Sequence, residues 1–269
     1  MIVRPDVIAG RRFVAVDWSG SQSGGGSQIW RAAVEEGALI VLEGPMTRAR
    51  VIATLLAWKA AAVPLLVGLD FGFSAPAWFL SRVGCRTAPE FWSVAGERGE
   101  AWLADCPPPF WGRPGRRRGS EIQFRQTELD CGGAPKSVFQ VGGAGAVGTG
   151  SIRGMPHLSQ LRSAGFAIWP FDAPAGATVL EIYPRLLTGP GPKRREQWCR
   201  SYLAALGWPS DPLQRAAAAS REDAFDAAVS ALRLWEAREE LAALAASAVP
   251  IDQAEGRIWR PTRPIAGIG

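Results

Sequence analysis

The chain has 269 residues, of which 47% are hydrophobic and 20% are charged, a balance that excludes a largely disordered protein. Its net charge of +5 permits an anionic partner such as nucleic acid without requiring one. No stretch reaches the roughly 20 apolar residues that cross a bilayer, and residues 1–12 lack the apolar core of a signal peptide. We therefore expect a cytoplasmic protein with no membrane partner, and no protein partner is predicted.

The first part of the chain alternates between strand-like and helical patterns. The apolar run Phe13 to Asp17 predicts a strand that ends in a carboxylate, and residues 28–34 and 38–42 predict two further strands of a meander. Thr47 is expected to cap a helix that continues to about residue 62, because apolar residues recur there at helical spacing. Leu65 to Asp70 repeats the opening pattern, as expected of a parallel strand buried on both faces.

The second part is less regular. From about residue 76 to 165 the periodicity fails, and we expect an insertion carried on the core. Thr178 to Tyr183 predicts a fifth strand, and residues 193–206 predict a helix. Residues 221 to about 246 are also expected to be helical, with a possible break. The basic residues 193–195 suit either nucleic acid or a solvated helix face. The expected fold is thus one α/β domain over residues 1–269, with a mixed five-stranded sheet, three antiparallel strands followed by parallel ones, flanked by helices.

Two carboxylates are expected at the carboxyl ends of strands, where loops converge in open α/β sheets. Asp17 and Asp70 both follow strand-like runs. If their strands are neighbours, the two side chains are close enough to share a hard cation such as Mg²⁺. The alternative is that each aspartate simply begins a turn.

A second pair of carboxylates lies on the last predicted helix. Asp223 and Asp226 are three residues apart and so share one helical face. An apolar stripe on the same segment would hold this helix against the sheet: Phe225, Ala228, Val229, Leu232 and Trp235. For Asp223 the alternative is a capping box with Ser220. Two like charges one turn apart repel each other, so the pair suggests a compensating cation.

Glu181 interrupts the otherwise apolar fifth strand. A buried carboxylate without a partner is costly, so Glu181 needs a metal ion, a basic group or a proton. The alternative to a metal is an ion pair with an arginine such as Arg185.

Basic residues of the expected insertion could contact a phosphate. Residues 143–148 match the G-x-G-x-x-G pattern, but we recognise no helix pattern after them, so a dinucleotide site is not expected. A flexible loop that offers N–H groups to a phosphate, with Lys136 nearby as a point charge, is more plausible. Arg116 and Arg117 follow Phe110 and Trp111, a mixture of charge and stacking surface that suits single-stranded nucleic acid. A solvated loop is the alternative.

Six segments in this order resemble the predicted ribonuclease-H-like nuclease family known as domain of unknown function 429: residues 16–20, 68–71, 135–140, 181–184, Asp223 with Asp226, and 255–259. The resemblance spans about Phe13 to Trp259 and implies the ribonuclease-H-like topology. It also implies carboxylates on the first and fourth strands and the last helix that hold two Mg²⁺ or Mn²⁺ ions. One ion would activate water and the other would stabilise the leaving oxygen of a phosphodiester. Ribonuclease H itself has a glutamate on the first helix, and residues 47–62 contain none.

The leading hypothesis is a metal-dependent nuclease, a hydrolase that acts on DNA or RNA. We expect Asp17, Asp70 and Asp226 to bind Mg²⁺ or Mn²⁺, with Asp223 or Glu181 completing the shell. The substrate-binding candidates are Lys136, Arg116 and Arg117. One alternative is a metal-dependent phosphohydrolase that acts on a small phosphorylated molecule, and another is a catalytically inactive binding or scaffold module with this fold.

Overall fold

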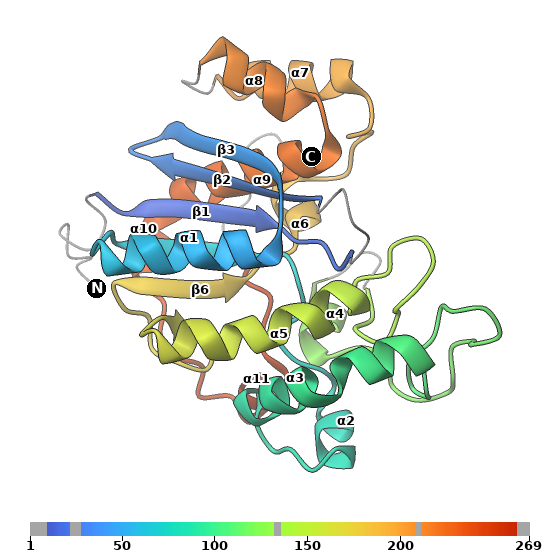
Figure 1. Ribbon diagram of the computed structural model, residues 1–269. Coiled ribbons are helices and arrows are strands. Elements are labelled where there is room, and N and C mark those ends of the chain that lie inside the picture. Colours follow the sequence, from blue (N-terminus) through green and yellow to red (C-terminus); the bar gives the residue numbers. More distant parts are fainter. Residues whose placement is uncertain (1–9, 22–27, 132–135, 208–210, 263–269) are drawn as a thin grey trace.

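The computed structural model describes residues 10–21, 28–131, 136–207 and 211–262, and a mixed six-stranded sheet lies at its centre (Figure 1). The strand order is β3-β2-β1-β4-β6-β5. The first three strands form an antiparallel meander, and the last three run parallel to β1. Their bounds are β1 Arg12–Asp17, β2 Ile29–Glu35, β3 Ala38–Met46, β4 Leu65–Leu69, β5 Ala167–Ile168 and β6 Ala177–Glu181.

Most of the predicted strand pattern is confirmed, together with the helix that separates β3 from β4. Thr47 caps that helix, α1 (Arg48–Ala60), by accepting a hydrogen bond from the amide of Arg50. The expected fifth strand is β6. The sheet has six strands instead of the expected five because the two-residue strand β5, at the sheet edge, is too short to show a periodicity.

Helices cover both faces of the sheet, with α9 on one face and α1 and α5 on the other (Figure 1). The apolar stripe expected on the last predicted helix lies on α9, which packs against β1 and β2. Four of its five residues are buried, and Trp235 is half-buried. None of the described helices is long and apolar enough to cross a membrane. The bounds of the helices after α1 are α2 Ala77–Arg82, α3 Ala88–Asp105, α4 Gln126–Asp130, α5 Gly148–Ser163, α6 Pro184–Thr188, α7 Glu196–Ala205, α8 Pro212–Ala219, α9 Glu222–Glu236, α10 Arg238–Ala242 and α11 Pro250–Glu255.

The segment between residues 76 and 165, where the sequence shows no periodicity, contains α2 to α5. α3 and α5 are difficult to predict from the sequence because both contain glycines, and glycine is a poor helix former. The structure explains two of these glycines by close packing. A Cβ on Gly154 would lie 2.7 Å from the ring of Phe71, and a Cβ on Gly99 would lie 2.6 Å from the side chain of Ile152. The division into a core and an insertion stays a prediction.

The register of the parallel strands determines where the functional candidates lie. β1 and β4 are neighbours, with Val16 opposite Leu69. Because Asp17 and Asp70 are the next residues on each strand, they leave the sheet side by side at its carboxyl edge. β6 lies on the other side of β4, with Glu181 opposite Leu69. The sheet therefore brings three of the expected carboxylates to one edge.

Candidate functional site

Four aspartates converge at the carboxyl edge of the sheet. The carboxyl of Asp17 is within hydrogen-bonding contact of Asp70 and of Asp223, and Asp226 is close enough to raise the pKa of both Asp17 and Asp70. Asp223 and Asp226 come from the first two turns of α9. Each of the four side chains is partly exposed, so the cluster is accessible to solvent from one side. The expected meeting of residues from β1, β4 and α9 is thus observed.

Burial and the charges of neighbouring carboxylates favour the protonated forms of Asp17 and Asp70. Burial, followed by the charges of Asp70, Asp226 and Asp223, raises the pKa of Asp17 well above its ordinary value. Burial raises the pKa of Asp70 to about 7, although its hydrogen bond with Asp17 opposes the rise. Asp17 and Asp70 therefore behave as a pair that shares a proton near neutral pH. A cation placed between them would relieve the same repulsion.

One cation is already part of the cluster. The Nζ of Lys193 lies 2.6 Å from Oδ1 of Asp226, and the two side chains are only 9% and 13% exposed. For residues 193–195 the sequence left open a solvated helix face. This is wrong for Lys193, which precedes α7 and is buried, whereas Arg194 and Arg195 are exposed. Three consecutive basic residues give no sign of which one points inward, so nothing in the sequence marks Lys193.

The chemistry of the donor set fits a hard divalent cation, since it consists of carboxylates without histidine or cysteine. Within the described part of the chain, however, no three His, Cys, Asp or Glu side chains are placed so that they could hold one ion together. Asp17 and Asp70 touch each other, and Asp226 is bound to Lys193.

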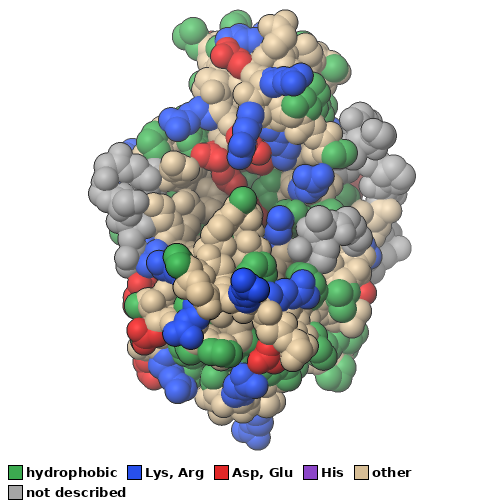
Figure 2. Space-filling model, turned by 90° about the vertical axis from the view of Figure 1, so that its right-hand side faces the viewer, with side chains coloured by type: hydrophobic (Ala, Val, Ile, Leu, Met, Phe, Trp, Pro, Cys, Tyr) green, Lys and Arg blue, Asp and Glu red, His purple; other side chains and the backbone are tan. Residues whose placement is uncertain are grey.

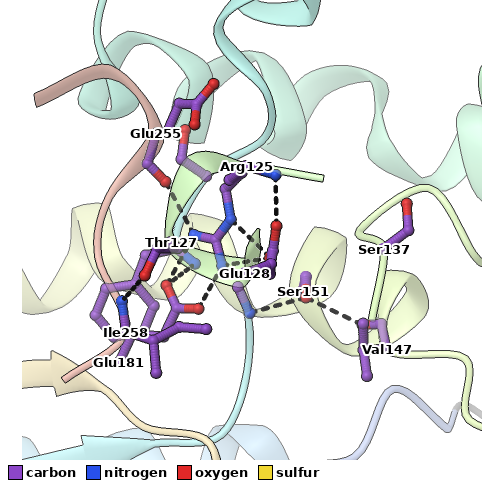
Figure 3. A network of polar contacts seen from close by, with 12 residues as sticks. Arg125, Thr127, Glu128, Ser137, Val147, Ser151, Glu181, Glu255 and Ile258 are labelled. Carbon is purple, nitrogen blue, oxygen red and sulfur yellow. Dashed lines mark hydrogen bonds and ion pairs between the residues drawn. The ribbon is translucent and has the colours of Figure 1, made fainter. Parts of the chain in front are cut away.

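Glu181 has a different partner from the one considered in the sequence. Arg125 donates from Nη1 to Oε2 of Glu181 at 2.9 Å and pairs with its other oxygen through Nη2, and the amide of Phe73 also donates to Oε2 (Figure 3). Arg125 pairs in addition with Glu128 at 2.7 Å, and all three charged side chains are buried. The ion pair expected as the alternative to metal binding is thus present, with Arg125 in place of Arg185. Asp223 remains as the carboxylate that completes the cluster.

Glu255, from the last motif of the family resemblance, is structural. Its Oε1 accepts a hydrogen bond from the amide of Ala77 at 2.8 Å, and its Oε2 accepts one from Gln126 at 2.7 Å, so that it caps both α2 and α4. Its carbonyl accepts from Arg125 (Figure 3). The C-terminal segment therefore fastens α2 and α4 to the sheet edge that carries Asp70.

The capping box considered for Asp223 is not formed. α9 begins after Arg221, whose side chain makes no capping hydrogen bond. Ser220 instead ends α8, and its hydroxyl donates to the carbonyl of Ala217. The alternative explanation of Asp223 as a member of that box is therefore wrong.

A small pocket of about 50 Å³ lies beside Asp70 and includes Lys136, Ser151 and Tyr183 in its lining. Lys136 lies against the glycine loop, since a Cβ on Gly145 would be 2.7 Å from its Nζ. The pocket thus places a cation next to the acidic cluster. The other two substrate-binding candidates, Arg116 and Arg117, are exposed and do not line this pocket.

The glycine loop is followed by a helix, contrary to expectation. α5 begins at Gly148, the third glycine of the pattern, so the reason given against a dinucleotide site is wrong. The second requirement of that motif is a preceding buried strand. Here the residues before the loop form only an isolated bridge, between Trp111 and Gln140. Of the predicted motif segment 135–140, residue 135 lies outside the described part of the chain.

Figure 2 views the molecule from the carboxyl ends of β1 and β6. Acidic side chains gather in a hollow below the lobe formed by α7 and α8, and Lys and Arg side chains surround it.

No protein-family model, curated protein or solved structure matches the chain. The family resemblance therefore stays a prediction, and the functional conclusion depends on the chemistry of the site.

Proposed function

We propose that the chain is a divalent-metal-dependent hydrolase of phosphodiester bonds in nucleic acid, built on a ribonuclease-H-like fold. One observation carries the proposal: four aspartates from three elements distant in sequence meet at one sheet edge, where burial raises the pKa of all four and neighbouring aspartates raise those of Asp17 and Asp70 further. Carboxylates perturbed in this way are typical of functional sites. The strand order also supports it, because three antiparallel strands, a helix and a parallel fourth strand form the topology that the resemblance implies.

The cluster assigns a role to each aspartate. Asp17, Asp70 and Asp223 would hold Mg²⁺ or Mn²⁺, which when bound supplies Lewis acidity to a phosphoryl oxygen. Asp226 holds the ammonium of Lys193 at the edge of the same cluster. Lys136, in the pocket beside Asp70, binds a substrate phosphate as a point charge.

The surroundings of the cluster favour an extended anionic substrate. Lys and Arg side chains surround the acidic hollow, as suits a nucleic-acid backbone (Figure 2). A second candidate, a small phosphorylated molecule, is favoured by the pocket of about 50 Å³ beside Asp70. The dependence on salt separates the two, since binding of nucleic acid releases counterions and weakens steeply as the salt concentration rises.

The test is a cleavage assay in Mn²⁺ on single strands, duplexes, hybrids and branched junctions. We expect the wild-type protein to cleave at least one substrate. Asp17→Asn and Asp70→Asn should abolish cleavage, because each removes a charge that holds the ion. Asp105→Asn is the matched control, since Asp105 is exposed at the end of α3, and it should retain full activity. Equal turnover by wild type and both cluster variants would overturn the proposal.

A further inference from the structure

An open groove of about 520 Å³ lies against the start of α5, apart from the pocket beside Asp70. It is bordered by residues 19–21, 112–113 and 141–153. The described residues that line it include five glycines, three small polar residues and two arginines, Arg113 and Arg153, and no carboxylate. A groove with this lining attracts anions, because no acid at its surface offsets the two cations.

Glycines allow the segments that form the groove to meet. A Cβ on Gly20 would overlap the amide nitrogen of Gly150, and a Cβ on Gly112 would overlap the carbonyl oxygen of Gly142. Any larger residue at these positions would push the main chains apart. The walls of the groove therefore consist largely of main chain, whose N–H groups suit the oxygens of an anion.

Two arginines hold the turn that forms one wall of the groove. Arg48 donates from Nη1 to the carbonyls of Ser19 and Ser21, each at 3.0 Å. Arg153 donates to the carbonyl of Gly20, which lies between them in the sequence. Burial lowers the pKa of Arg48, and the charge of Arg153 lowers it further, so the two guanidinium groups are close together. Two like charges gathered on one turn favour an anion beside it.

The acid nearest to these arginines neutralises only part of their charge. Glu100 pairs with Arg153 at 2.7 Å, but its side chain is 60% exposed, so that water screens the pair. Arg113 is exposed and donates from Nη2 to the carbonyl of Leu103 at 3.0 Å, a contact that leaves its charge in place. Three arginines and one glutamate thus leave two positive charges around the groove.

The groove is continuous with the candidate functional site. Its first lining residue is two positions after Asp17, at the carboxyl end of β1, and α5 begins at the same edge of the sheet (Figure 1). Residues 149–150 line the groove, whereas Val147 and Ser151 line the pocket beside Asp70. An extended anion in the groove can therefore reach that pocket by crossing the first turn of α5.

We propose that this groove binds the phosphate backbone of a nucleic-acid strand beside the acidic cluster, with Arg113 and Arg153 as its charged contacts. The inference rests on the proposed function and specifies the path of its substrate. Arg116 and Arg117, the arginines expected to bind substrate, line neither the groove nor the pocket. A strand fits better than a small phosphorylated molecule, because the groove is open and leads into a second site.

The test is titration of labelled single-stranded DNA and RNA oligonucleotides with the full-length protein in EDTA, followed by fluorescence anisotropy. We expect the wild type to bind at least one of them. Arg113→Gln and Arg153→Gln should each lower the slope of log K against log salt by about 0.7, which corresponds to about a fivefold rise in Kd at about 0.1 M salt. Arg162→Gln is the matched control, at the other end of α5 and also in an ion pair, and should change neither quantity.

Ala146→Asp tests the groove without removing a side-chain contact. It adds a negative charge to the lining and should weaken binding at least as much as either arginine variant. If circular dichroism shows that Arg153→Gln does not fold, Arg113→Gln and Ala146→Asp still test the groove. AMP, which carries a single phosphate, should compete only weakly with the oligonucleotide.

The outcomes separate this inference from the proposed function. Equal binding by the wild type, Arg113→Gln and Ala146→Asp, or an equal loss in Arg162→Gln, would overturn the groove and leave the proposed nuclease standing. AMP that binds as tightly as the oligonucleotides would also overturn it, in favour of a small phosphorylated ligand. If no oligonucleotide binds, both the groove and the nucleic-acid substrate are overturned. Binding as expected, without cleavage in Mn²⁺, would overturn the metal-dependent function alone.

Discussion

Replacing Asp70 by asparagine removes one ionisable group from the pair with Asp17 while it keeps the size and the hydrogen-bonding capacity of the side chain. In the metal-free protein the folded state holds a proton on Asp70 more tightly than the unfolded chain does, because burial raises the pKa to about 7. The folded state is therefore destabilised as the pH rises from about 4 through about 7. Asparagine has the same shape but does not ionise, so Asp70→Asn does not lose stability in this way as the pH rises.

The expected gain in stability of Asp70→Asn can be calculated from the pKa shift of Asp70. The pKa of Asp70 moves from 3.8 to about 7, and each pKa unit corresponds to about 1.4 kcal/mol. Relative to acidic pH, the raised pKa of Asp70 then lowers the free energy of unfolding by about 2 kcal/mol at pH 5, where only the unfolded chain ionises it, and by at most about 4 kcal/mol at pH 8. Asp70→Asn should exceed the wild type in stability by amounts of this order, with the larger gain at pH 8.

Urea denaturation in EDTA, followed by tryptophan fluorescence at pH 5 and pH 8, measures both gains. Asp105→Asn is the control and should change the stability at neither pH. The reasoning is refuted if Asp70→Asn gains the same stability at both pH values, or if the wild type is the more stable protein at pH 8. Either result would mean that Asp70 is ionised at little cost in the folded state.

Three further substitutions test separate parts of the account. Arg125→Met leaves two buried glutamates unpaired and should lower the free energy of unfolding, measured by urea denaturation, by about 3 to 5 kcal/mol. Arg162→Met removes a more exposed ion pair and should lower it by less than about 1 kcal/mol. Equal losses in the two variants would contradict this. Gly154→Ala should lower the stability by about 1 to 3 kcal/mol, whereas Gly176→Ala, with open space around it, should not. Lys136→Ala should reduce the salt dependence of nucleic-acid binding by about one phosphate contact, and an unchanged slope would remove Lys136 from the interface.

Local pattern was enough to predict the acidic edge of the sheet. Asp17 and Asp70 each end a continuous apolar run, and such runs are typical of neighbouring parallel strands. The spacing of Asp223 and Asp226 places both on the face of α9 that meets the cluster. These inferences hold because a strand's period and a helix's period are properties of the sequence itself.

The partners of the charged groups could not be predicted, because they depend on how distant loops pack. Glu181 was recognised as a carboxylate in need of a partner, but Arg125 lies 56 positions away, in a segment without periodicity. Lys193 meets Asp226 across 33 positions in the same way. The start of α5 directly at the glycine loop was missed for a related reason, since glycines weaken a helix locally, yet Gly154 of this helix is needed for its close approach to Phe71.

Anomalous diffraction from crystals soaked in Mn²⁺ tests the central claim most directly, because it locates the ion without reference to any substrate. The proposed function predicts an anomalous peak in contact with the carboxylates of Asp17, Asp70 and Asp223. Crystals that show no peak at these aspartates, with Asp17 and Asp70 still in contact with each other, would contradict it.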